Sequence, residues 1–240
     1  MTDATVAFPD RAARATAALE DALQTAQTVD LSWLDRPLTA DGWELAPDTL
    51  RLLDALVVRL RPRHVIEFGS GISTLVLARA AARAGGCLVS TLDHDPRFVR
   101  ASAEQLEDAE GRELVALQLA PLVARSRAGA LGPEYLLDPA CLASTLPADL
   151  VLIDGPPAAL GGRTGMLYQA LDHAQSGSIV LLDDAGRPSE QAALDAWHER
   201  LGDAIRIHRL AGFAKGLAAV VVAAPTTAQI RIAGASRSGA

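Results

Sequence analysis

Three short segments of this 240-residue chain are apolar nearly throughout, and each stops at a glycine or a carboxylate. They read VIEF at residues 65–68, LVLID at 150–154 and IVLLD at 179–183. Strands that are apolar over their whole length are typical of a parallel sheet covered by helices on both faces. Segments with the helical spacing of apolar residues lie between them. This alternation predicts an α/β fold with a doubly wound, mostly parallel sheet.

The complete pattern predicts seven strands. The last two are joined by AGFAKG, which leaves no room for a helix, so we expect them to form an antiparallel hairpin at one end of the sheet. The strands are expected at residues 64–68, 87–92, 113–119, 150–154, 178–183, 205–210 and 217–223. Helices are expected at residues 9–29, 48–60, 73–84, 96–109, 164–174 and 189–201.

The domain organisation follows from these elements. Half of the residues are hydrophobic, which is enough apolar material for one sizeable core. We expect residues 1–47 to form an N-terminal helical extension and loop, residues 48–224 to form the main domain, and residues 225–240 to form a flexible tail of small and polar residues.

Composition limits the partners. A net charge of −7 argues against binding to a nucleic-acid backbone. The longest apolar run, residues 216–225, is too short to span a membrane, and the N-terminus does not resemble a secretory signal. The two cysteines form neither a disulfide framework nor a zinc pattern. We therefore expect a cytoplasmic protein with a small-molecule partner, and a homodimer is an open alternative.

The motif EFGSGIST runs from Glu67 to Thr74 and is the strongest chemical signal. A buried strand enters the turn Gly69-Ser70-Gly71, whose glycines allow a sharp bend and a close ligand approach before a helix N-terminus. The dinucleotide fingerprint requires glycine where Thr74 stands. The Glu67 carboxylate would repel a pyrophosphate, but it suits the ammonium and sulfonium of S-adenosylmethionine. The helix N-terminus would receive the carboxylate of that ligand.

A second motif, STLDHDP, ends the second predicted strand. Asp93 lies a little over twenty residues beyond the glycine turn, where an acid can accept hydrogen bonds from both hydroxyls of a ribose. His94 could flank an adenine, although a histidine beside a helix cap often has no such role. Asp95 is expected to cap the helix that opens at Pro96.

Three carboxylates end the fourth and fifth predicted strands, in DLVLIDGPP and GSIVLLDDAGRP. Asp154, Asp183 and Asp184 should meet beside the cofactor pocket, because neighbouring parallel strands end at the same edge of a sheet. They are candidate ligands for Mg²⁺ or another divalent cation. Asp154 and Asp183 are also candidate catalytic residues, with Asp154 the candidate general base. The alternatives are a shared proton, or hydrogen bonds from arginine and backbone amides.

The loop GPPAALGGRTG after Asp154 carries Arg163, the third candidate catalytic residue. Arg163 could clamp an anionic group of a substrate or close over the site on a flexible lid. An arginine on the solvated surface is an equally good interpretation.

Together, EFGSGIST, LDHD, LVLIDGPP and IVLLDDAGRP resemble the motifs of class I S-adenosylmethionine-dependent methyltransferases. They are closest to a bacterial subgroup whose first motif reads E-x-G-S-G-x-S-T and whose fourth strand ends in I-D-G-P-P. The resemblance covers about residues 42–224. It implies a Rossmann-like fold of seven strands and S-adenosylmethionine as the cofactor. The cofactor residues that it implies are Glu67, Gly69, Gly71 and Asp93. Ser70, Thr74, His94 and Asp154 are further candidate cofactor-binding residues.

The resemblance also implies transfer of a methyl group to an oxygen atom of a small molecule. Metal-dependent members of this superfamily usually have Asp-Asn after the fifth strand, whereas this chain has Asp183-Asp184. The resemblance to those enzymes is therefore partial. Two alternatives are kept open: a nicotinamide-dependent oxidoreductase, which Glu67 and Thr74 disfavour, and a ligand-binding protein without catalytic activity on the same fold.

Overall fold

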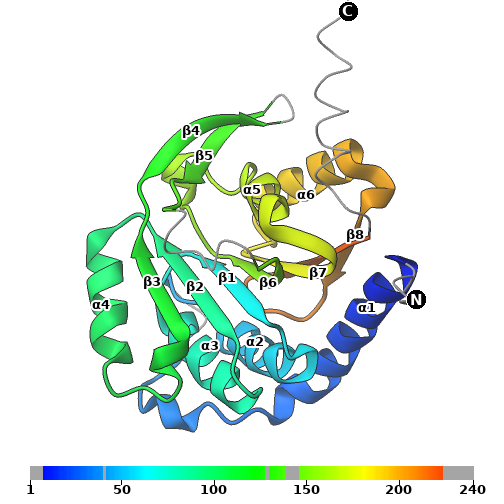
Figure 1. Ribbon diagram of the computed structural model, residues 1–240. Coiled ribbons are helices and arrows are strands. Elements are labelled where there is room, and N and C mark those ends of the chain that lie inside the picture. Colours follow the sequence, from blue (N-terminus) through cyan, green and yellow to red (C-terminus); the bar gives the residue numbers. More distant parts are fainter. Residues whose placement is uncertain (1–7, 40–41, 128–129, 139–145, 224–240) are drawn as a thin grey trace, which may run out of the picture.

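The structure, a computed structural model, describes residues 8–39, 42–127, 130–138 and 146–223. Its centre is a seven-stranded sheet with the order β3-β2-β1-β6-β7-β9-β8 (Figure 1). The first five of these strands are parallel, and β9 is antiparallel to both of its neighbours. The predicted fold class is confirmed. The strands are β1 (His64–Phe68), β2 (Leu88–Asp93), β3 (Val115–Leu119), β6 (Ala148–Ile153), β7 (Ala174–Asp183), β8 (Ile205–Leu210) and β9 (Leu217–Val222).

Helices cover both faces of the sheet. The α-helices are α1 (Phe8–Thr25), α2 (Pro47–Leu60), α3 (Ile72–Arg83), α4 (Pro96–Leu106), α5 (Met166–His173) and α6 (Pro188–Leu201). Short 3₁₀ turns are η1 (Ala26–Thr28), η2 (Ser32–Leu34), η3 (Arg112–Leu114), η4 (Ala158–Leu160) and η5 (Gly202–Ala204).

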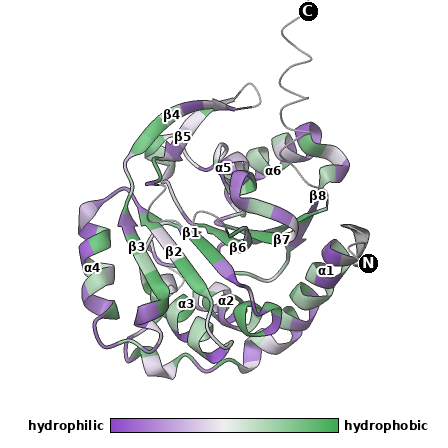
Figure 2. Cartoon of the chain, in the orientation of Figure 1, coloured by the Kyte–Doolittle hydropathy of each residue, from purple (hydrophilic) through white to green (hydrophobic). Residues whose placement is uncertain are grey.

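The strands are apolar because alternate side chains enter two different cores. Val65 and Leu150 pack with α1, α2 and α3 on one face. Ile66 and Val151 pack with α5 and α6 on the other. Figure 2 shows the hydrophobic residues concentrated on the central strands. A strand with both faces buried has apolar residues at nearly every position, so this arrangement accounts for the pattern in the sequence.

A hairpin that the sequence analysis missed lies between β3 and β6. It consists of β4 (Leu122–Arg127) and β5 (Ala130–Tyr135), which pair in a separate antiparallel sheet. Figure 1 shows it extending away from the main sheet, on the side opposite to α2 and α3. Most of the β4 side chains are at least partly exposed. They therefore need not be apolar, and the hairpin leaves no apolar run in the sequence. Pro133 within β5 also lacks the N–H that a central strand would use.

Some predicted boundaries were wrong. The first helix ends at Thr25 rather than at residue 29, and the chain continues in η1. Strand β7 begins at Ala174, four residues before its predicted start. There the Ser178 hydroxyl accepts a hydrogen bond from Gln175 N (2.8 Å) and donates one to Ala148 O (2.6 Å). These contacts hold the polar segment in the sheet although its residues are not apolar.

The predicted N-terminal extension packs against the main domain. Ala12, Ala15 and Leu19 of α1 belong to the same core as α2 and α3. The division at residue 47 remains a prediction. The predicted tail at residues 225–240 lies outside the described residues. None of the helices within the described ranges is long and apolar enough to span a membrane.

Candidate active site

Four parallel strands end side by side at one edge of the sheet. Phe68 of β1 pairs with Leu92 of β2 and with Ile153 of β6, and Ile153 pairs with Leu182 of β7. The residues that follow these positions are therefore neighbours at the switch point of the sheet, where open α/β folds bind ligands. The predicted candidates at these positions are Gly69, Asp93, Asp154 and Asp183.

The glycine turn after β1 is tightly packed and internally hydrogen-bonded. Gly69 has φ of +102°, and a Cβ atom there would lie 3.2 Å from the backbone N of Gly155. Both facts require glycine at this position. The backbone N of Gly71 donates to Thr74 Oγ1 (3.1 Å), and that hydroxyl donates to Glu67 Oε2 (2.7 Å). Glu67 of β1 therefore stabilises the turn through the Thr74 hydroxyl.

Glu67 lies beneath this turn and is completely buried. Its Oε2 also accepts a hydrogen bond from Thr91 Oγ1 (2.8 Å), whereas Oε1 has no partner among the described residues. Burial raises the pKa of the Glu67 carboxyl to about 7, against the effect of these hydrogen bonds. Glu67 and Thr74 therefore support the turn. Direct contact between either residue and a cofactor stays a prediction.

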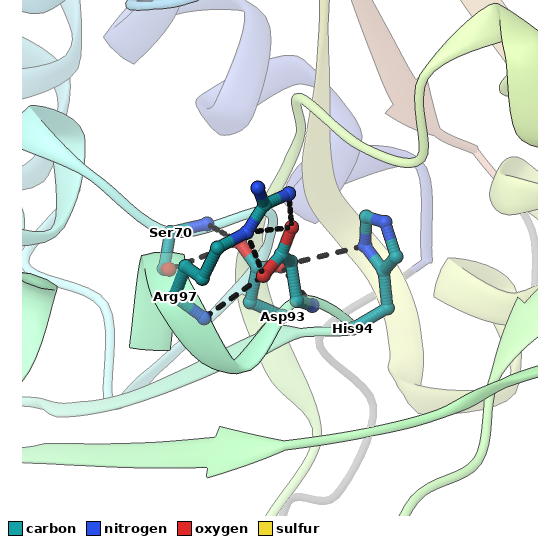
Figure 3. A network of polar contacts seen from close by, with 5 residues as sticks. Ser70, Asp93, His94 and Arg97 are labelled. Atoms are coloured by element: carbon teal, nitrogen blue, oxygen red, sulfur yellow. Dashed lines mark hydrogen bonds and ion pairs between the residues drawn. The ribbon is translucent and has the colours of Figure 1, made fainter. Parts of the chain in front are cut away.

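Asp93 is the acid that organises the end of β2. Its Oδ2 accepts hydrogen bonds from Ser70 N (2.8 Å) and Ser70 Oγ (2.9 Å), and its Oδ1 accepts one from Asp95 N (2.9 Å). Figure 3 shows Asp93 between Ser70 and His94, whose Nδ1 lies 3.4 Å from Asp93 Oδ1. Asp95 accepts a hydrogen bond from Arg97 N (2.8 Å), so its predicted role as the cap of α4 is confirmed.

Tyr135, the last residue of β5, lies among the candidate residues and was missed by the sequence analysis. Its ring stacks on Phe68 (5.4 Å between centroids) and meets the edge of His94 (6.2 Å). Its hydroxyl has no hydrogen-bond partner among the described residues and lies against Gly155. Burial raises the pKa of Tyr135 well above its usual value, and the Asp93 and Asp154 carboxylates raise it further. No motif marks this residue.

The structure brings Asp154, Asp183 and Asp184 together, as the sequence predicts. One carboxylate oxygen from each lies within 4.8 Å of the other two. Burial raises the pKa of Asp154 to about 6, although Arg163 acts in the opposite direction. Burial and the neighbouring Asp154 raise the pKa of Asp183 to about 8. The surroundings of Asp154 and Asp183 thus disfavour the charged form of each carboxylate.

Arg163 lies inside this acidic cluster and is only 6% exposed, so the interpretation of a solvated surface arginine is wrong. Its Nη1 donates to Asp183 O (2.6 Å). Its Nη2 contacts the Asp154 carbonyl oxygen, Asp154 Oδ1 (3.1 Å) and Asp184 Oδ2 (2.9 Å). Arg187 reaches Asp184 Oδ2 from the surface (2.8 Å). Hydrogen bonds from arginine, one of the three predicted alternatives, therefore offset the repulsion among these acids.

Asp184 and Asp183 differ in how their carboxylates are used. Asp184 has a positive φ of 59°, an uncommon conformation for a residue with a side chain, and its carboxylate receives two arginines. Asp183 is completely buried, and neither of its carboxylate oxygens has a hydrogen-bond partner within the described part of the chain. Such a group is costly to keep charged.

A cavity of about 510 Å³ opens elsewhere, in the helical layer formed by α1, α2 and α3. Thr25, Asp54 and Arg83 are among its lining residues, and none of the candidate site residues lines it. We locate the site at the strand ends because the glycine turn and the convergent acids are there. Tyr135 lies beside them, with its hydroxyl against Gly155.

Comparison with known proteins identifies a domain that contains these residues. Residues 66–185, which make up half of the chain, match a protein-family model described as "Methyltransferase domain". This range includes the glycine turn, Asp93 and all three acids of the cluster. No curated protein sequence matches the chain.

Several solved structures are similar in fold. The cofactor-bound protein Rv0187 from MTB has a TM-score of 0.54 and 18% identity, over 88% of this chain and 90% of its own. The O-methyltransferase TomG from Streptomyces achromogenes, in complex with SAM, has a TM-score of 0.55 and 18% identity, over 85% and 89%. An O-methyltransferase from Bacillus cereus, in complex with SAH, has a TM-score of 0.54 and 18% identity, over 86% and 90%.

At this level of identity the similar structures establish the fold, and the family match establishes the relationship. The seven-stranded sheet, its antiparallel hairpin and its flanking helices are those of the Rossmann-like methyltransferases. The chain belongs to the methyltransferase-domain family.

Proposed function

We propose that the protein is a class I, S-adenosylmethionine-dependent methyltransferase that methylates an oxygen atom of a small molecule. Membership of the methyltransferase-domain family supports the reaction class. Two of the similar structures are O-methyltransferases, one in complex with SAM and the other with SAH, which supports the cofactor and the acceptor atom. The subgroup motifs E-x-G-S-G-x-S-T and I-D-G-P-P fit the same proposal.

The observation that carries this proposal is the coupling of the glycine turn to Asp93. A carboxylate has about four acceptor positions, and Asp93 uses three of them for Ser70 and Asp95. The fourth position faces His94 Nδ1, which lies 3.4 Å from Oδ1 without a hydrogen bond, so a shift of His94 would open it, and rotation of the Ser70 hydroxyl would release a second. Two free positions on one carboxylate match the two neighbouring hydroxyls of a ribose.

The other candidate residues fit the remaining parts of the cofactor. The N-terminus of α3, next to Gly71, suits the carboxylate of the methionyl part. A Cβ atom at Gly71 would have nothing within 4 Å, so one side of the turn is open to a ligand. His94 would flank the adenine, and Tyr135 would have to move aside. When bound, S-adenosylmethionine supplies an activated methyl group.

Asp154 is our candidate for the general base. It follows β6 directly, and its pKa of about 6 lies near the working pH, as a proton acceptor requires. Arg163 fixes its orientation through Nη2 and Oδ1, 3.1 Å apart. Asp154 would then accept the proton of the acceptor hydroxyl, directly or through a water molecule, as the oxygen attacks the methyl carbon in line.

The test is methyl transfer from labelled S-adenosylmethionine to a panel of phenols, catechols, hydroxy acids and amines. We expect an oxygen acceptor to be labelled, and Asp154→Asn to lower the rate by about 10²- to 10⁴-fold. Asp149→Asn is the matched control. Asp149 lies at the other end of β6, where it accepts hydrogen bonds from Arg63 and Gln175, so its rate should be normal.

The outcomes of this test separate the alternatives. Binding of S-adenosylmethionine without transfer to any acceptor would favour a non-catalytic binding protein. Binding of a nicotinamide dinucleotide in its place would favour an oxidoreductase. A labelled amine would overturn the choice of oxygen, and normal turnover in Asp154→Asn would remove Asp154 from the mechanism.

A further inference from the structure

We propose that Arg163 takes the place of a divalent cation among Asp154, Asp183 and Asp184, so that this acidic cluster works without a metal ion. The inference rests on the proposed function only for its catalytic consequence. The arrangement of the side chains carries the structural claim by itself.

The spacing of the three acids would suit a single ion, because one carboxylate oxygen from each lies within 4.8 Å of the others. Arg163 already contacts two of these three carboxylates. Its Nη2 lies 3.1 Å from Asp154 Oδ1 and 2.9 Å from Asp184 Oδ2, and it also contacts the Asp154 carbonyl oxygen. One nitrogen therefore joins the acids that follow two neighbouring strands, and it holds them together by its own positive charge.

Arg163 engages two of the three carboxylates that a hard cation would need. With Arg163 in place, Asp183 contributes the only carboxylate of the cluster without a hydrogen-bond partner among the described residues. Mg²⁺ demands near-ideal octahedral geometry even where water completes its shell, and Arg163 Nη2 already contacts the Asp154 and Asp184 oxygens that would have to face the ion. A divalent ion beside Asp183 would also be repelled by the guanidinium. The residues therefore do not fit a metal ion while Arg163 stays in its position.

The backbone around Arg163 holds it there. Gly161 and Gly162 have φ of +106° and +71°, and a Cβ atom at Gly161 would lie 2.9 Å from Pro133 Cδ. The carbonyl oxygen of Arg163 accepts a hydrogen bond from Met166 N (3.0 Å) at the start of α5. The next carbonyl, of Thr164, accepts one from Trp197 Nε1 (2.8 Å). The loop packs against β5 and is anchored to α6, so Arg163 is a fixed element of the site.

Guanidinium chemistry suits this role. The group keeps its charge at any physiological pH, and its planar set of donors can hold several oxygens at fixed angles. Arg163 uses both terminal nitrogens, one toward the end of β7 through Asp183 O (2.6 Å) and the other toward Asp154 and Asp184. We therefore infer that Arg163 is a positioning residue, which orients Asp154 and supplies the positive charge that a metal ion would supply.

The experiment measures binding of Mn²⁺ and Mg²⁺ to the protein without cofactor or acceptor, by calorimetry and by the melting temperature Tm. We expect the wild type to bind neither ion at the cluster and to show the same Tm with either ion or with EDTA. In Arg163→Ala we expect a lower Tm in EDTA and a gain of Mn²⁺ binding. An ion concentration of about ten times the dissociation constant should then raise its Tm by about 3–6 °C.

Two further variants give the matched controls. Arg187→Ala removes the arginine that reaches Asp184 from the surface, so it should gain no ion binding. Arg163→Ala combined with Asp183→Asn should lose the gain, because a ligand is removed. If Arg163→Ala does not fold, Arg163→Met replaces it, and the wild-type measurement stands in either case.

Stoichiometric Mn²⁺ binding by the wild type that Asp183→Asn abolishes would overturn the proposal. A folded Arg163→Ala or Arg163→Met protein without any gain of ion binding would overturn it as well. In the methyl-transfer assay, the proposal predicts the same rate with EDTA as with Mg²⁺. Because the binding measurements use no cofactor, failure of the methyltransferase function would leave their result unaffected.

Discussion

Gly155 and Tyr135 provide a quantitative test of the arrangement at the strand ends. A Cβ atom added to Gly155 would overlap the Tyr135 hydroxyl, whereas its next neighbours, Gly69 Cα and Gly69 N, lie at an ordinary 3.5 Å. The Tyr135 side chain is buried in this conformation, so displacing it to relieve the overlap costs free energy. Overpacking of this kind costs about 1–3 kcal/mol. For a chain of this size, Gly155→Ala should lower Tm by about 2–10 °C.

The hydroxyl of Tyr135 is the cause of that overlap, so its removal should relieve it. Tyr135→Phe deletes a buried hydroxyl without a partner among the described residues. Because an unpaired buried polar group costs about 1–3 kcal/mol, Tyr135→Phe alone should be neutral or stabilising. In the double variant we expect most of the loss caused by Gly155→Ala to be recovered.

The assay is urea unfolding of the wild type, the two single variants and the double variant, followed by circular dichroism and analysed as a double-mutant cycle. Tyr168→Phe is the matched control, since Tyr168 is equally buried but its hydroxyl interacts with Arg200. Tyr168→Phe should destabilise the protein, and its effect should add to that of Gly155→Ala. Additive effects of Gly155→Ala and Tyr135→Phe would refute the reasoning.

Two further predictions concern stability. Burial raises the pKa of Glu67 from 4.5 to about 7, so the stability that its protonated form provides is complete below pH 4.5 and is lost as pH rises to 7. Between these pH values the free energy of unfolding of the wild type should fall by about 3 kcal/mol, and in Glu67→Gln this fall should be absent. Urea unfolding of both proteins measures the difference. Gly111→Ala should cost about 2–4 kcal/mol, because φ is +83° and a Cβ atom would overlap the Ala78 carbonyl. Gly85→Ala, with φ of +100° and open space, should cost only about 1–2 kcal/mol, and equal losses would contradict this account.

The central strands and the turns that follow them could be predicted because their signals are local. A strand buried on both faces is apolar at nearly every position, and residues 65–68, 150–153 and 179–182 carry that pattern, with Glu67 as the exception. The positive φ of Gly69 and the cap at Asp95 are also local requirements. Parallel pairing then determines that Asp154 and Asp183 meet, because both follow neighbouring strands at the same edge.

The β4–β5 hairpin and its role in the site could not be predicted in this way. Its strands are not apolar, and they are held by contacts with distant residues. Gln169 of α5 exchanges hydrogen bonds with Tyr135, accepting from Tyr135 N (3.0 Å) and donating to Tyr135 O (2.7 Å). Arg127 forms ion pairs with Glu134 and with Asp172 of α5. Such contacts depend on the complete fold.

The orientation of the Arg163 side chain could not be predicted from the sequence either. The glycines around it predict a loop, but they do not tell whether the side chain points outward or inward. Only the packing of Gly161 against Pro133 and the anchoring of Thr164 by Trp197 direct it into the acidic cluster. Pro133 and Trp197 both lie about thirty residues away from this loop in the sequence, so the local sequence does not reveal these contacts.

The most direct test of the central claim is calorimetric titration with S-adenosylmethionine. We expect the wild type to bind it in preference to NAD, and Asp93→Asn to weaken binding by about ten- to a hundredfold, since a hydrogen bond to a charged acceptor contributes about 1.5–3 kcal/mol. Asp95→Asn, which alters the neighbouring cap of α4, should bind normally. A wild type that does not bind S-adenosylmethionine, or an Asp93→Asn variant that binds it equally well, would contradict the account.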